Sequence, residues 1–142
     1  MRLSVFLLVA ALLLGGLTGG CAAGAPDKVA QPPGQGAEGM QAEVIGAAQA
    51  KEIMEQDRTC AVVDVREPDE FAAGHVPGAR LLPLGEIEKR AAEVLPDKNQ
   101  LILLYCRSGR RSALAAQKLA ALGYTRLKDF GGIMDWPYAV EK

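Results

Sequence analysis

The chain has 142 residues, of which 49% are hydrophobic, and carries 16 Lys and Arg against 17 Asp and Glu. A formal net charge of −1 excludes a strongly basic protein that binds nucleic acid through its overall charge, and we predict no nucleic-acid partner. About 100 residues remain beyond the N-terminal segments described next, which is a common size for one compact domain.

The first residues are typical of an export signal. Arg2 precedes an apolar run over 3–14, which is shorter than the roughly 20 residues of a membrane span. The segment Leu17–Cys21 resembles a bacterial lipobox, in which the cysteine is lipidated and becomes the new N-terminus. We therefore predict an export signal over 1–21, lipidation of Cys21, and a protein anchored to a membrane in the cell envelope or periplasm. Because the leucine lies one position further from the cysteine than in the commonest pattern, ordinary cleavage near 22–24 and an uncleaved anchor are the alternatives.

Residues 22–41 are rich in proline and glycine and almost free of large apolar side chains. Such a segment buries too little surface to offset the entropy lost on ordering. We predict a flexible tether, which would span roughly 25 Å on average and hold the domain over 42–142 clear of lipid headgroups.

The rest of the chain alternates between strand-like and helix-like segments. Residues 42–45 predict a short strand, and the apolar positions of 47–56 recur at helical spacing. The apolar run at 60–65 predicts a buried strand. Pro68 is placed to begin a short helix over 68–73, which ends before Gly74.

The second half of the domain continues this alternation. It predicts a weak strand over 79–82, an amphipathic helix over 85–94 and the most apolar strand over 101–105. The strongest helix follows over 112–122, then a last strand over 125–128 and a helical turn over 133–136. Strands that alternate with helices predict an α/β fold with a small parallel five-stranded sheet and helices on both faces.

Cys106 directly follows the most apolar predicted strand. Ligands of parallel sheets bind beyond the carboxyl ends of the strands, which places a site here. A thiol between a strand and a helix faces backbone N–H groups and the positive end of a helix dipole, and both favour the reactive thiolate. We predict an ionised nucleophile, open to solvent, beside Arg107, Arg110 and Arg111, which attract an anionic substrate. Which of Arg110 and Arg111 faces the pocket is left open.

Several motifs occur together: 63–67, 70–79, 106–112, and Gly131–Gly132 with Trp136. They resemble a single-domain rhodanese. The resemblance implies a sulfurtransferase without a cofactor, which moves a sulfane sulfur from thiosulfate or polysulfide to a thiophilic acceptor such as cyanide or a thiol. It also implies that Cys106 attacks the outer sulfur of the donor and holds it as a persulfide. The residues expected to bind the substrate are Arg107, Ser108, Gly109, Arg110, Arg111 and Ser112.

Other functions are weighed against this one. Cysteine-based phosphatases of the same fold resemble Cys-x5-Arg, whereas Cys106 and Arg111 form Cys-x4-Arg, and the tighter loop favours a single sulfur over phosphate or arsenate. The basic loop favours thiosulfate over 3-mercaptopyruvate. A low-turnover sulfane-sulfur carrier and a non-catalytic rhodanese-like binding module are the alternatives to an enzyme.

The remaining polar residues are predicted to have structural roles. Asp64 and Arg66 are expected to form a charge-assisted pair that fixes the loops beside the site. His75 is expected to make a structural hydrogen bond rather than a Cys–His dyad. Cys60 is expected to be a structural thiol, with a disulfide to Cys106 as the alternative. One histidine and scattered thiols predict no metal site.

Overall fold

The computed structural model describes residues 41–142. Its elements are β1 (Glu43–Val44), α1 (Ala47–Gln56), β2 (Ala61–Asp64), α2 (Pro68–Ala73), β3 (Arg80–Leu81), the 3-10 turn η1 (Leu84–Glu86), α3 (Ile87–Val94), β4 (Ile102–Cys106), α4 (Arg110–Ala121), β5 (Leu127–Gly132) and the 3-10 turn η2 (Ile133–Asp135). The predicted export signal, Cys21 and nearly all of the predicted tether lie outside the described residues. Within residues 41–142, no helix is both long and apolar enough to cross a bilayer.

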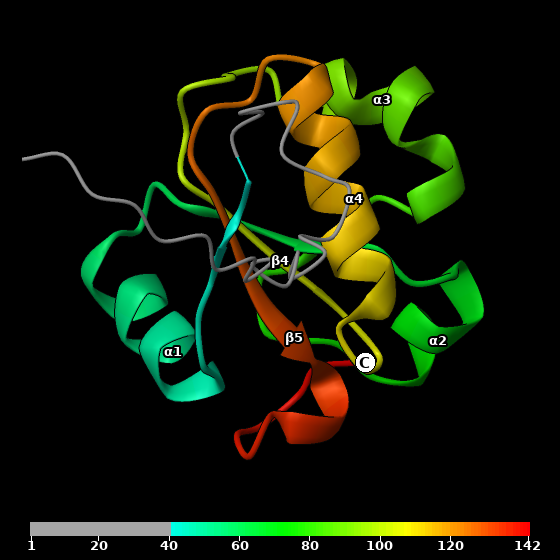
Figure 1. Cartoon of the computed structure of the whole chain (residues 1–142). Helices are drawn as coiled ribbons and strands as arrows, with labels where there is room; N and C mark the ends of the chain where they lie inside the picture. The colour runs from blue at the N-terminus through cyan, green and yellow to red at the C-terminus, as the bar shows by residue number, and fades with distance from the viewer. Residues whose placement is uncertain (1–40) are drawn as a thin grey trace, which may run out of the picture. The chain divides into compact units, whose positions relative to one another are not determined.

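The five strands form one sheet in the order β1-β5-β4-β2-β3, and every neighbouring pair is parallel. Parallel neighbours need long crossover connections, which the helices between the strands supply. Figure 1 shows α1 on one side of the sheet and α2, α3 and α4 on the other. The predicted α/β fold with a five-stranded parallel sheet is therefore confirmed.

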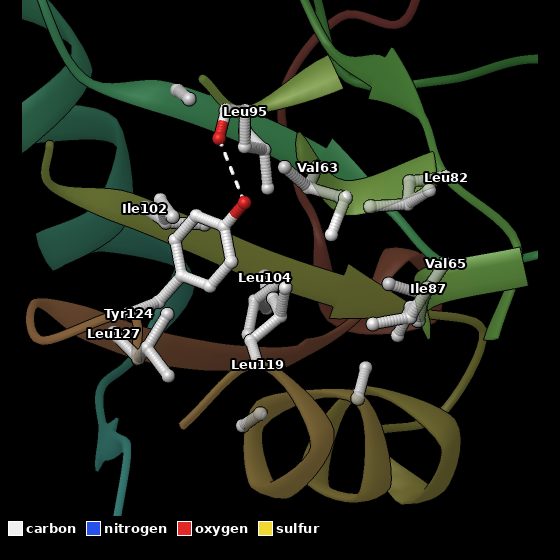
Figure 2. Close-up of a cluster of buried hydrophobic side chains, with 14 of the residues drawn as sticks. Val63, Val65, Leu82, Ile87, Leu95, Ile102, Leu104, Leu119, Tyr124 and Leu127 are labelled. Carbon is white, nitrogen blue, oxygen red and sulfur yellow. Dashed lines mark hydrogen bonds between the residues drawn. The ribbon is translucent and has the colours of Figure 1, made fainter. Parts of the chain in front are cut away.

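The central strand β4 contributes to two cores, because successive side chains of a strand point to opposite faces of the sheet. Ile102, Leu104 and Cys106 belong to the cluster that contains side chains of α3 and α4. Leu103 and Tyr105 belong to the cluster that contains side chains of α1. Figure 2 shows the first cluster, in which side chains from the sheet pack against those of the helices on that face. The cysteine thus lies at the edge of a packed core.

Some element boundaries differ from the predicted ones. α4 begins at Arg110 rather than at residue 112, because Gly109 adopts a left-handed φ of 93° and ends the preceding loop there. β5 covers Leu127–Gly132 rather than 125–128. The N–H of Thr125 is bonded to the carbonyl oxygen of Lys98 (3.1 Å), which lies outside the sheet, so the strand begins only at Leu127. The predicted helix over 85–94 is divided into η1 and α3.

Candidate active site

Cys106 is the last residue of β4, at the carboxyl edge of the sheet. Residues 107–109 form a short loop, and α4 follows directly. The left-handed conformation of Gly109 turns the chain sharply, so that the first turn of α4 lies next to the cysteine from which the loop began. The strand and the helix therefore hold the thiol from two sides.

Backbone N–H groups of the loop surround the sulfur. The N–H of Gly109 donates to Sγ of Cys106 at 3.1 Å. Burial by itself raises the pKa of the thiol, but hydrogen bonds from the backbone N–H groups of Ser112, Ser108 and Gly109 lower the pKa of Cys106 to below that of an ordinary cysteine. The hydroxyl of Ser112 lies beside the sulfur and donates to the carbonyl oxygen of Gly109 at 3.0 Å.

The thiol is covered, contrary to our expectation that it would be open to solvent. Cys106 is 1% exposed, whereas Arg107, Ser108 and Arg110 are exposed. The difference arises because Cys106 is still part of β4 and packs with the core, while the loop folds over its sulfur. The structure therefore leaves Cys106 almost no direct contact with solvent.

The three arginines have different surroundings. Nη1 and Nη2 of Arg111 bind the two carboxylate oxygens of Glu70 in α2, at 2.6 and 2.8 Å. This hydrogen bonding raises the pKa of Arg111, and the nearby sulfur of Cys106 raises it further. Arg107 and Arg110 are exposed, and neither forms an ion pair with another residue of the described chain. Arg111 is therefore the inner arginine, and Arg110 points to solvent.

The end of β5 packs directly against the backbone of the loop that follows Cys106. A Cβ atom on Gly132 would lie 2.2 Å from the carbonyl oxygen of Arg107 and 2.6 Å from Cα of Ser108. The N–H of Met134, in η2, donates to the same carbonyl oxygen at 3.3 Å. The backbones of the two segments thus pack at a distance that leaves no space for a side chain at residue 132.

Asp64 and Arg66 form an ion pair beside the site. Nη2 of Arg66 lies 2.6 Å from Oδ2 of Asp64, and both side chains are buried. The same Nη2 donates to the carbonyl oxygen of Gly74 at 2.8 Å, and the N–H of Val76 donates to the hydroxyl of Tyr105 at 3.0 Å. The pair therefore fixes the segment after α2 near Tyr105, the neighbour of the cysteine, without itself bonding to the sulfur.

Two other predicted structural residues are placed away from the chemistry. Nδ1 of His75 is hydrogen-bonded to the carbonyl oxygen of Phe71 at 3.0 Å, and the two rings stack with centroids 3.7 Å apart. Cys60 and Cys106 are both free thiols, and Cys60 packs against the second core cluster. Within residues 41–142, no group of three or more His, Cys, Asp or Glu side chains could hold a metal ion.

The pH dependence of alkylation tests the electrostatics of the loop. We expect Cys106 to react with iodoacetamide with a midpoint below that of an ordinary cysteine, because a lowered pKa produces the thiolate at a lower pH as the pH rises. Cys60 is an internal control, since burial raises the pKa of its thiol. Peptide mass spectrometry after timed alkylation measures both residues. A midpoint for Cys106 equal to or above that of Cys60 would contradict this account of the site.

A cysteine whose ionisation is favoured by loop N–H groups, at the carboxyl edge of a small parallel sheet, defines an α/β protein with a candidate active site at that thiol. Comparison with known proteins gives its family. The family model of the rhodanese-like domain matches residues 46–138, so the chain belongs to the rhodanese-like domain family.

Individual relatives agree with this assignment. Thiosulfate sulfurtransferase PspE of Escherichia coli is 41% identical over 73 residues, which are 51% of this chain and 70% of PspE. The putative sulfur carrier protein YrkF of Bacillus subtilis is 38% identical over 87 residues, which are 61% of this chain but only 46% of YrkF. Among solved structures, a rhodanese with anions from E. coli aligns with a TM-score of 0.55 at 37% identity, over 58% of this chain and 98% of that one.

Sequence reasoning overlooked two contributors to the site. Glu70, the partner of Arg111, is 41 residues away in the chain, and no local pattern joins them. Gly131–Gly132 is among the predicted features only as part of the family resemblance. Two consecutive glycines at the end of a predicted strand are a signal of close backbone approach, which is what the structure shows at Gly132.

Proposed function

We propose that the protein is a sulfurtransferase that takes a sulfane sulfur from thiosulfate or polysulfide and carries it as a persulfide on Cys106. The observation that carries the proposal is the group of loop N–H donors around a thiol of lowered pKa. These donors stabilise the attacking thiolate and also the persulfide that replaces it, because both are anions. The name of PspE supports thiosulfate as donor.

The proposed reaction balances in two steps. The Cys106 thiolate attacks the outer sulfur of thiosulfate, the new S–S bond forms, and the donor's S–S bond breaks with its electron pair leaving on sulfite. Cyanide or an acceptor thiolate then attacks the terminal persulfide sulfur and expels the Cys106 thiolate. Neither step moves a proton, because Cys106 attacks and later leaves as a thiolate, so the loop requires no general acid or base.

The carrier role is the second candidate, and the similarity to YrkF, a putative sulfur carrier protein, favours it. The intact mass after thiosulfate treatment and the production of thiocyanate from cyanide distinguish the candidates. An enzyme gains one sulfur and turns over, whereas a carrier gains the sulfur and produces negligible thiocyanate. A chain that gains no sulfur from any sulfane donor is a non-catalytic binding module.

Arg110 is expected to attract the donor. Its side chain is exposed and unpaired among the described residues, so Arg110→Ala should raise the KM for thiosulfate about three- to tenfold and weaken the dependence of KM on salt. Steady-state kinetics at two ionic strengths measures both effects. The matched control is Arg126→Ala, which removes an exposed charge beside the amino end of β5. Equal KM values for the two variants would refute the steering role.

We also propose export and attachment to a membrane through a lipid on Cys21. The support is the leader sequence, with its apolar run and its lipobox-like segment ending at Cys21. Incorporation of labelled fatty acid into the wild type, and its loss in Cys21→Ala, is the expected result. Labelling that persists in the variant, or is absent from both, would overturn the lipid anchor.

A further inference from the structure

The ion pair between Glu70 and Arg111 joins α2 to the first turn of α4, which directly follows the loop after Cys106. Glu70 lies in α2 and Arg111 in the first turn of α4, one residue before Ser112, whose backbone N–H faces the sulfur. Both terminal nitrogens of the guanidinium bind the carboxylate, in the bidentate geometry that fixes an arginine most firmly. The side chains are 30% and 25% exposed, so solvent screens the pair only partly.

Without a partner, an arginine side chain on the first turn of a helix would not be held near a buried thiol. Its side chain has high rotamer entropy, and water solvates the free guanidinium well. Glu70 removes this freedom, and the bonds it makes are strong enough to lower the pKa of Glu70 to about 2. The other charged group that acts on Glu70 is Arg66, which is itself paired with Asp64.

We propose that Glu70 is a positioning residue: by holding both terminal nitrogens of Arg111, it keeps that positive charge at the start of α4, one residue from the Ser112 backbone N–H that faces the sulfur, and so favours the anionic forms of the sulfur. The proposal deepens the proposed function, since the persulfide is one of these anions. It also separates the tasks of the arginines. Arg111 is fixed for the sulfur, whereas Arg107 and Arg110 are free to meet the donor.

The choice of variant follows from a second contact of Glu70. Its carboxylate also accepts a hydrogen bond from the backbone N–H of Glu67 at 3.2 Å, which is part of a capping box at the start of α2. Glu70→Gln keeps one oxygen acceptor for this cap, and it removes the negative charge and one of the two acceptor oxygens that anchor Arg111.

The test is the pH profile of Cys106 alkylation by iodoacetamide in the full chain. In Glu70→Gln we expect the midpoint to rise, so that the alkylation rate near pH 6 falls about three- to tenfold. Arg111→Lys, which retains a charge but not the two-pronged geometry, should shift it in the same direction. In an Arg111→Ala background the Glu70→Gln change should produce no further fall in rate, because no guanidinium remains to be positioned.

Two controls separate positioning from structural damage. Glu67→Ala weakens the cap of α2 without removing the partner of Arg111, and Glu88→Gln breaks a surface ion pair with Lys118 on the same helix α4. Neither should move the midpoint. An unchanged or lower midpoint in Glu70→Gln would overturn the proposal, because a lower one would mean that Glu70 draws the guanidinium away from the sulfur. The measurement needs no sulfur donor, so it stands even if the chain proves not to transfer sulfur.

Discussion

Replacement of Cys106 by serine is expected to abolish sulfur transfer, with a fall of at least about a thousandfold in the rate of thiocyanate formation. A serine hydroxyl is not ionised near neutral pH, and it cannot hold a sulfane sulfur as a persulfide. The loop N–H groups would remain, but with no anion to stabilise. The intact mass after treatment with thiosulfate should show one added sulfur in the wild type and none in Cys106→Ser.

The matched control is Cys60→Ser. Cys60 precedes β2, at the amino edge of the sheet, whereas Cys106 ends β4 at the carboxyl edge. Sulfur loading of Cys60→Ser should equal that of the wild type. Retention of the added sulfur in Cys106→Ser, or its loss in Cys60→Ser, would assign the persulfide to a different residue and remove the basis of the proposed mechanism.

Gly132→Ala is expected to have the second largest effect. The added methyl group would overlap the backbone of the active-site loop, with the carbonyl oxygen of Arg107 only 2.2 Å away, so the loop or the end of β5 must move. We expect a loss of about 2–4 kcal/mol in the free energy of unfolding. We also expect sulfur loading to be at least about tenfold slower, because a displaced loop no longer directs its N–H groups at the sulfur. An effect of roughly this size is expected when one hydrogen-bond donor to a developing anion is misplaced. Urea denaturation and timed mass spectrometry measure the two quantities.

Two other glycines, Gly131 and Gly85, separate crowding from backbone strain. Gly131 has a φ of +86° but open space around its Cβ position, so Gly131→Ala should cost about 1 kcal/mol through strain alone. Gly85 has neither a positive φ nor a close neighbour, and Gly85→Ala should be neutral. Loading kinetics in Gly132→Ala that match those of Gly131→Ala would show that the close contact is not needed to shape the loop.

Local sequence signals were sufficient to predict the helices whose ends are set by residues close to them in the chain. The bounds of α1 and α2 are as predicted, 47–56 and 68–73, because apolar periodicity marks the first and Pro68 and Gly74 delimit the second. The predicted bounds of β5 are wrong because the length of this strand depends on its pairing with β4, where Cys106 is opposite Gly132 after an irregularity in the register. Pairing between strands that are distant in the chain leaves no mark within either one.

The site shows the same division. The position of Cys106 at the end of an apolar strand could be predicted, and so could the presence of N–H donors in a loop that leads into a helix. The burial of the thiol could not, because it depends on how the loop and the end of β5 pack together. Which of the arginines is held could not be predicted either, since a carboxylate on another helix decides it.

Cys106 is 1% exposed, and this burial affects which reagents could reach a persulfide formed on it. A buried sulfur is reached by slim, linear reagents far more readily than by bulky ones. We expect the loop to select reagents by size: the outer sulfur of a small donor should react readily, whereas branched disulfides and large thiols should react slowly. A stored sulfane atom would then survive encounters that strip an unprotected persulfide, and would be released only to acceptors narrow enough to enter.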